Sequence, residues 1–174
     1  MSKNSNFLNP TPAQIKYRNR LWAEELIKNR RKAIGLMTDE HGGRCCLKVA
    51  EDLFFKIAKE KKYDLTMVSY NSSPTMPGNY VSSFFGWDSS NRKIFKDPSI
   101  FKNRDAHSIH LKQYSASQPI LLIDGRNSRY KKRKYALASK LNDSCKMSHK
   151  KIAECVLNTL VHPSKPKWVL NKKR

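Results

Sequence analysis

The sequence predicts a single, mostly helical α+β domain with a small β-hairpin, one or two further short strands and basic tails. At 174 residues, the chain has the length of one domain. Apolar residues recur at helical spacing in several stretches, whereas the runs with strand character are short. With 39% hydrophobic and 28% charged residues, the composition is that of a folded protein with a large polar surface.

We divide the chain into a flexible N-terminal arm (1–10), a domain (11–161) and a basic C-terminal tail (162–174). The first helix of the domain should begin at Thr11, a suitable N-cap that is followed by a proline at the first helical position and by a glutamine that completes a capping box. It is expected to reach Asn29. Its inner face carries Ile15, Trp22 and Leu26.

Residues 32–46 predict a small β-hairpin that leads into the central helix. The stretch 32–37 has strand character, 38–43 is a polar turn with two glycines, and 44–46 would form the returning strand. The next helix, 47–61, has the clearest amphipathic pattern in the chain, so we expect it to form the centre of the core. Its inner face carries Leu47, Ala50, Leu53, Phe54, Ile57 and Ala58.

The remaining elements are shorter. We expect a strand within 63–70, a helix from Pro77 to Phe85 that ends at Gly86, an irregular insertion at about 88–118, and a strand at 118–123. A basic run, 126–134, should enter a helix that continues to Leu141. The last helix, 148–160, has Ser148 as its N-cap.

Residues 43–52, Gly-Arg-Cys-Cys-Leu-Lys-Val-Ala-Glu-Asp, resemble the G-x-CCLGV-x-x-D signature of a family of small, largely uncharacterised proteins of tailed bacteriophages. Lys48 stands where the family usually has glycine. The resemblance covers roughly 16–87 and 126–160, and implies a shared fold and a viral protein but no activity, cofactor or partner. The family's other motifs occur in the same order: a helix with Trp22, a Pro-led apolar segment at 76–87, L-x-x-LND at 137–143 and S-x-x-x-IA at 148–153.

The cysteines are expected to be reduced, because adjacent cysteines do not readily bond to each other and no disulfide framework is indicated. Four residues could bind zinc only if their segments met, and the familiar C-x2-C spacing is missing. These weak metal candidates are His41, Cys45, Cys145 and His149. We therefore expect no metal and no cofactor, and interpret Cys45 and Cys46 as small buried residues at a helix start.

No catalytic constellation is evident. Asp39, Glu40 and His41 cluster in a turn, and His107 and His110 form an H-x2-H pair in the insertion. Hydrolysis of nucleic acid needs metal-binding carboxylates on rigid elements, and no second carboxylate cluster completes such a site. Turn formation and solvent exposure explain both groups, so we expect no enzymatic activity.

The net charge of +21 is unevenly distributed. Residues 1–48 contain ten Lys and Arg against four Asp and Glu, 49–125 contain ten against eight, and 126–174 contain fifteen against two. A balanced middle and a strongly cationic C-terminal third indicate a polyanionic partner, most commonly nucleic acid.

The predicted nucleic-acid-binding residues combine cations for phosphates with aromatic rings for unstacked bases. The strongest stretch is 126–134, the C-terminal tail repeats the pattern, and the first helix adds further cations. These residues are Arg18, Arg20, Arg30, Arg31, Arg126, Arg129, Tyr130, Lys131, Lys132, Arg133, Lys134, Lys165, Lys167, Trp168, Lys172, Lys173 and Arg174.

We therefore expect a non-catalytic basic protein that binds RNA, in preference to DNA, or a ribonucleoprotein surface such as the ribosome, through phosphate contacts. An alternative is a phage-type accessory protein that binds and modulates an acidic host protein. Two further alternatives are a sequence-specific DNA-binding regulator, because 131–141 and 148–160 could form a helix-turn-helix, and a metal-dependent nuclease. Without a long apolar run or a secretory signal, we expect a cytoplasmic protein and no membrane partner.

Overall fold

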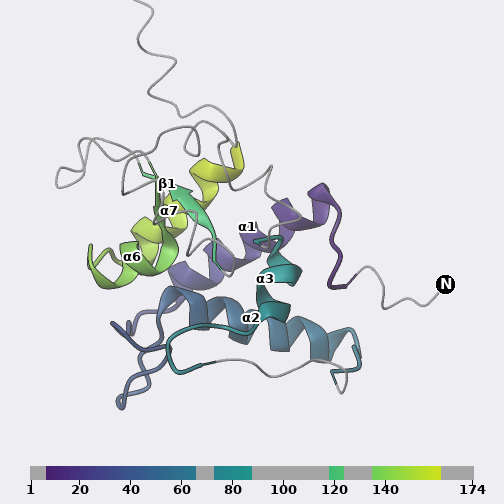
Figure 1. The fold of residues 1–174 in the computed structure, drawn as a ribbon, viewed down its shortest axis with the longest axis horizontal. Coiled ribbons are helices and arrows are strands. Elements are labelled where there is room, and N and C mark those ends of the chain that lie inside the picture. Colours follow the sequence, from purple (N-terminus) through teal and green to yellow (C-terminus); the bar gives the residue numbers. More distant parts are fainter. Residues whose placement is uncertain (1–6, 66–72, 88–117, 124–134, 162–174) are drawn as a thin grey trace, which may run out of the picture.

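The computed structural model describes residues 7–65, 73–87, 118–123 and 135–161, which form the mostly helical α+β fold that the sequence predicts (Figure 1). α1 crosses the middle of the molecule, with α7 packed along one side and α2 along the other, and α3 contacts both α1 and α2. The elements are α1 (Pro12–Lys28), α2 (Cys46–Glu60), α3 (Asn79–Phe85), β1 (Ile120–Leu122), β2 (Tyr135–Leu137), α6 (Ala138–Asp143) and α7 (His149–Val161).

The start of α1 confirms the predicted capping box. Thr11 Oγ1 accepts the N–H of Gln14 at 3.3 Å, and the Thr11 N–H donates to Gln14 Oε1 at 2.8 Å. The three predicted apolar residues of this helix, Ile15, Trp22 and Leu26, are fully buried. Local sequence signals therefore determine both where α1 begins and which face it buries.

α2 forms the centre of the core, as its amphipathic pattern predicts. Its first turn is joined to α1 by the Trp22 indole, which donates to the Cys46 carbonyl at 2.9 Å. Phe54 of α2 lies among three aromatic rings from the N-terminal segment and α3, with ring centroids 5.8 Å from Phe7, 5.0 Å from Tyr80 and 5.2 Å from Phe84. Such tilted and edge-on ring pairs add to the stabilisation from apolar burial.

Asn19 and Gly86 join α1 to the end of α3. The fully buried Asn19 amide donates to the Phe85 carbonyl at 2.8 Å, and its oxygen accepts the Trp87 indole N–H at 2.9 Å. Gly86 has a positive φ of 69°, which ends α3 as predicted and brings its backbone against Ile15.

Three local predictions are wrong. The hairpin expected at 32–46 is a loop with two isolated bridges, Lys32 to Arg44 and Thr38 to Arg44, and the antiparallel sheet is instead formed by β1 and β2. β2 occupies residues expected to be helical, so that α6 begins only at Ala138. The flexible arm is shorter than expected, because Phe7 is buried and stacks on Tyr63 at 4.1 Å.

Two further predictions, the insertion at 88–118 and the strand within 63–70, lie largely outside the described residues. Residues 63–65, which are described, form no strand. Among the described helices, none combines the length and the apolar character that crossing a membrane requires.

Candidate nucleic-acid interface

The structure separates the predicted binding residues into two groups. Thirteen of the seventeen lie in 124–134 and 162–174, outside the described residues. The described part of the chain contains seventeen Lys and Arg against ten Asp and Glu, a net charge of +7 out of +21. Residues outside the described ranges therefore carry the other two thirds of the net charge.

Arg18 is a structural residue, which contradicts its predicted role in binding. Its Nη1 donates to the Phe7 carbonyl at 2.9 Å and to the Phe84 carbonyl at 2.8 Å, and its guanidinium carbon lies 3.9 Å from the Phe84 ring centroid. Only 8% of the residue is exposed, and burial lowers its pKa to about 10. Arg18 ties the N-terminal segment to α3 and is not accessible to a phosphate.

Arg20, Arg30 and Arg31 are exposed, as their predicted role requires. Arg20 lies on the outer face of α1, whereas Arg30 and Arg31 follow the end of this helix. The Arg31 backbone carbonyl accepts the N–H of Arg44 at 3.1 Å, and its side chain donates to the His41 carbonyl at 3.4 Å. The backbone of Arg31 is therefore held beside that of Arg44.

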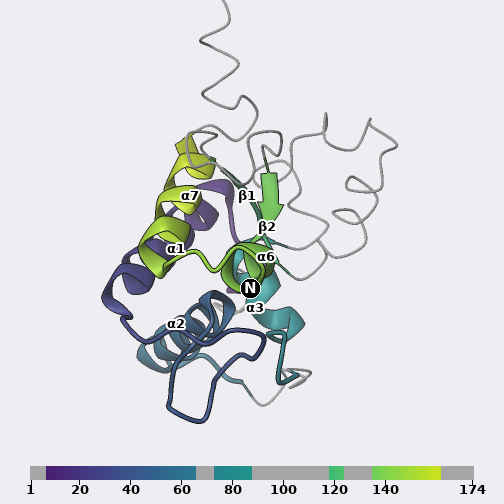
Figure 2. The same ribbon diagram turned by 90° about the vertical axis from the view of Figure 1, so that its left-hand side faces the viewer.

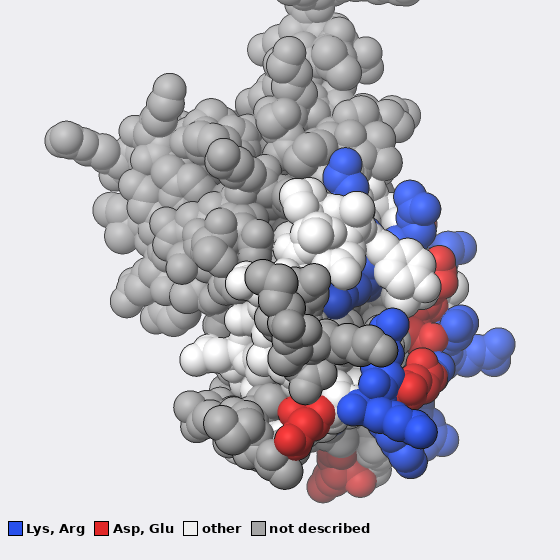
Figure 3. Space-filling view, turned by 90° about the vertical axis from the view of Figure 1, so that its right-hand side faces the viewer, with Lys and Arg blue, Asp and Glu red and all other residues white. Residues whose placement is uncertain are grey.

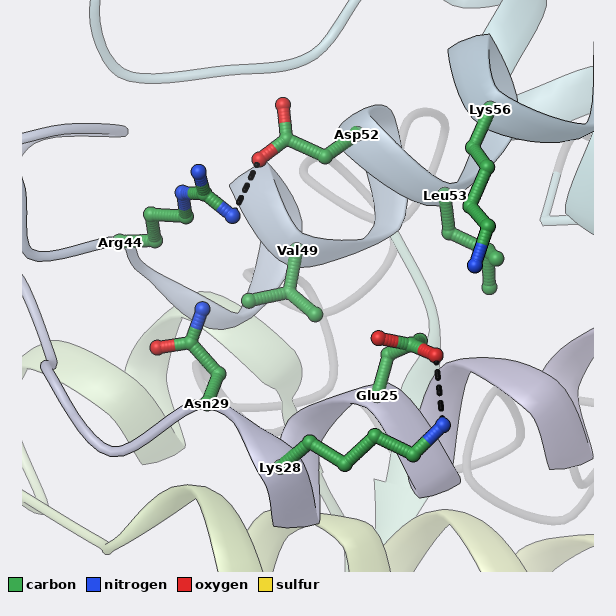
Figure 4. A pocket seen from close by; sticks show the side chains of 8 residues that line it. All are labelled: Glu25, Lys28, Asn29, Arg44, Val49, Asp52, Leu53 and Lys56. Carbon is green, nitrogen blue, oxygen red and sulfur yellow. Dashed lines mark hydrogen bonds and ion pairs between the residues drawn. The ribbon is translucent and has the colours of Figure 1, made fainter.

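A cleft of about 320 Å³ lies between the last turn of α1 and the first half of α2 (Figure 4). Its two sides carry ion pairs, Arg44 Nη1 to Asp52 Oδ2 at 3.2 Å and Lys28 Nζ to Glu25 Oε1 at 2.9 Å. The other lining residues are Asn29, Val49, Leu53 and Lys56.

The two carboxylates of this cleft are neutralised by their partners. Asp52 also binds Lys48, Oδ1 to Nζ at 3.1 Å, and Lys56 makes no ion pair with any other described residue. The lining thus contains three cations against two carboxylates, and a backbone hydrogen bond joins Arg44 to Arg31.

On another face of the molecule the charges are mixed. Figure 3 shows Lys and Arg side by side with Asp and Glu along one edge of the molecule, so this face does not present a continuous cationic stripe. Exposed ion pairs of this kind contribute little to stability and reduce the local positive potential. Arg30 and Arg31, which are exposed after the end of α1, remain candidates for phosphate contacts.

The adjacent cysteines are buried packing residues. Cys45 is the N-cap of α2, where its Sγ accepts the N–H of Lys48 at 3.4 Å, and the Cys46 thiol donates to the Ala138 carbonyl at 3.5 Å. Burial raises the pKa of both thiols, which keeps them protonated and unreactive.

The proposed zinc ligands do not come together. His41 is exposed, whereas His149 is buried with its Nδ1 3.1 Å from the Asn29 carbonyl oxygen. Within the described ranges, no three His, Cys, Asp or Glu side chains are close enough to hold a metal ion.

Asp39 stabilises a turn, as one of the two interpretations of this acidic cluster predicts. Its Oδ1 accepts the N–H groups of His41 at 3.0 Å and Gly43 at 2.6 Å. Glu40 lies 3.4 Å from the ring of His41 in an exposed pair. These residues are accounted for by local turn structure.

One surface feature was not predicted. Ile34 and Leu36, which we expected in a strand, are exposed in the loop between α1 and α2. The signal in the sequence was the short apolar stretch 33–37 with Gly35 at its centre, which suits a strand as well as an exposed loop.

Comparisons with known proteins place no constraint on this interface: no protein-family model, no curated protein and no solved structure matches the chain. The resemblance to bacteriophage proteins therefore stays a prediction from the motifs of the sequence.

Proposed function

We propose that this chain is a non-catalytic nucleic-acid-binding protein that holds RNA, free or within a ribonucleoprotein, mainly through phosphate contacts. The observation that carries the proposal is the separation of charge. Residues 126–174 contain fifteen Lys and Arg against two Asp and Glu, whereas 49–125 contain ten against eight. A strongly cationic stretch in a chain whose middle is nearly balanced is suited to a polyanion, whose condensed counterions it releases on binding.

The exposed cations of the body support this proposal. Arg44 lines the cleft, its N–H donates to the Arg31 carbonyl, and Arg30 precedes Arg31 in the sequence, so a bound strand would find further cations there. Tyr130 and Trp168 lie within the basic segments of the sequence and offer rings on which unpaired bases can stack, which favours RNA or single strands over a regular duplex.

Filter binding of a structured RNA to the full-length protein at rising salt tests this proposal. The affinity should fall steeply, with a slope of log K against log salt of roughly −0.7 to −0.9 per phosphate contact. Replacing Lys172, Lys173 and Arg174 by Ala should make the slope less steep by roughly two units.

A matched variant that replaces Lys56, Lys59 and Lys61 of the body by Ala removes the same charge. It should change the slope by less, because only Lys56 borders the cleft. A flat salt dependence for the unmodified protein would contradict the proposal, as would equal effects of the two triple variants.

A further inference from the structure

The loop between α1 and α2 presents two large aliphatic side chains to solvent. Ile34 and Leu36 are 51% and 47% exposed, and the loop projects from the body beneath α2 in Figure 2. Their neighbours in the sequence, Ala33 and Met37, are buried at 1% and 5%. Residues 33–37, which we call the tip, are thus buried at both ends, while the two aliphatic side chains between these ends are exposed.

Hydrogen bonds to distant segments fix this tip. The Gly35 N–H donates to Asp143 Oδ1 at 3.0 Å, and the Met37 N–H donates to the Pro74 carbonyl at 2.7 Å. The Asn142 amide donates to the Ala33 carbonyl at 2.9 Å. Because the backbone is already ordered, a ligand that covers Ile34 and Leu36 would meet little entropic cost of ordering the loop.

The charge beside the tip is positive. Arg30 and Arg31 precede it, and Arg44 accepts the Ala33 N–H through its carbonyl at 3.1 Å. Within the loop and its contact with Asp143, four cations (Arg30, Arg31, Lys32 and Arg44) outnumber three carboxylates (Asp39, Glu40 and Asp143). The complementary ligand therefore combines negative charge with apolar surface. A nucleic acid meets both requirements, with phosphates for the arginines and base faces for the aliphatic side chains.

We propose that Ile34 and Leu36 form an apolar wedge that packs against unstacked bases of the bound RNA, while Arg30 and Arg31 hold the adjacent phosphates. This inference rests on the proposed function and adds to it a contact that does not depend on charge. Aliphatic side chains that insert at a base step are an established way in which proteins distort nucleic acids.

The test uses full-length protein and an RNA hairpin whose loop contains 2-aminopurine, which becomes brighter when it is unstacked. In the Ile34→Ser/Leu36→Ser variant we expect the affinity to fall about 10-fold at every salt concentration, since half of each aliphatic side chain is available for burial. The salt slope should stay unchanged, because apolar contacts release no counterions. The fluorescence increase on binding should be lost.

Two matched variants complete the experiment. Arg30→Gln/Arg31→Gln should reduce the salt slope by about one to two units. Tyr17→Ser/Ile27→Ser removes two apolar side chains that are exposed to a similar extent, 64% and 53%, from the outer face of α1 and should leave both affinity and fluorescence unchanged. Single Ile34→Thr and Leu36→Ser variants provide the same readout with smaller changes if the double variant unfolds.

The possible failures are distinguishable. Salt-independent or absent binding by the unmodified protein would overturn the proposed function itself. If the unmodified protein showed steep salt dependence but the Ile34→Ser/Leu36→Ser variant kept normal affinity and fluorescence, the wedge alone would be overturned. Contact of the tip with a protein partner would then be the alternative. A changed salt slope in the tip variant, or equal losses in the Tyr17/Ile27 variant, would also overturn it.

Discussion

Replacing Arg18 by Met tests whether this arginine is part of the fold. Its guanidinium donates to the carbonyls of Phe7 and Phe84 and lies over the Phe84 ring, with 8% of the residue exposed. Methionine retains much of the aliphatic stem but removes the charge and both hydrogen bonds, so it isolates the polar contribution of the side chain.

The expected loss follows from these contacts. Hydrogen bonds from a charged donor contribute about 1.5 kcal/mol each at the lower end of their range, and a cation over a partly buried ring contributes about 1 kcal/mol. Burial of the charge opposes these contributions, as the lowered pKa of Arg18 shows. We therefore expect the variant to lose about 3 kcal/mol in the free energy of unfolding.

Urea denaturation monitored by tryptophan fluorescence would measure this loss, because Trp22 and Trp87 are both buried. Arg20→Met is the matched control: Arg20 is exposed on the same helix, and its replacement should change stability by less than about 0.5 kcal/mol. If Arg18→Met were as stable as Arg20→Met, Arg18 would not tie the N-terminal segment to α3.

Three further predictions concern other parts of the fold. Gly86→Ala should lower the free energy of unfolding by about 2–4 kcal/mol in urea denaturation, because a Cβ there would lie 2.5 Å from Ile15 Cδ1 at a φ of 69°. Gly35→Ala is the control: with a φ of 77° and open space around it, it should lower the free energy of unfolding by only about 1 kcal/mol. Burial lowers the pKa of His149 below its ordinary value of 6.5, so the unfolded chain binds a proton more readily; the stability contribution is complete above about pH 6.5 and is lost as the pH falls below it. His149→Gln should weaken this decline in the urea midpoint between pH 7 and pH 5, and an unchanged decline would contradict the assignment. In native protein, a thiol reagent should label the partly exposed Cys145 first and the buried Cys46 only after unfolding; rapid labelling of Cys46 would show that the start of α2 is not packed as described.

The elements that the sequence predicted well are those with strong local signals. The capping box at Thr11 set the start of α1, and the amphipathic pattern of 47–61 identified α2 to within a residue at each end. Gly86 ended α3 as predicted, because a glycine tolerates the left-handed conformation there. Each of these signals acts over a few residues, so it can be interpreted without knowledge of the rest of the chain.

The candidate interface was only partly predictable for the same reason. Arg20 and Arg18 lie two positions apart on one helix and look alike in the sequence, yet packing against Phe7 and Phe84 makes one of them structural. The apolar character of 32–37 suited a strand, but its backbone hydrogen bonds include those to Pro74, Asn142 and Asp143. No local pattern shows these distant partners.

The sequence by itself determined the fold class, the buried faces of α1 and α2 and the large positive charge, because helix periodicity, capping and net charge are local or additive properties. Only the tertiary structure decided that Arg18 is buried, and that Arg31 lies beside Arg44. It also decided that Ile34 and Leu36 are exposed in a loop whose backbone is hydrogen-bonded to distant segments. These outcomes depend on contacts between residues far apart in the chain, whose geometry is set by the packing of the whole core.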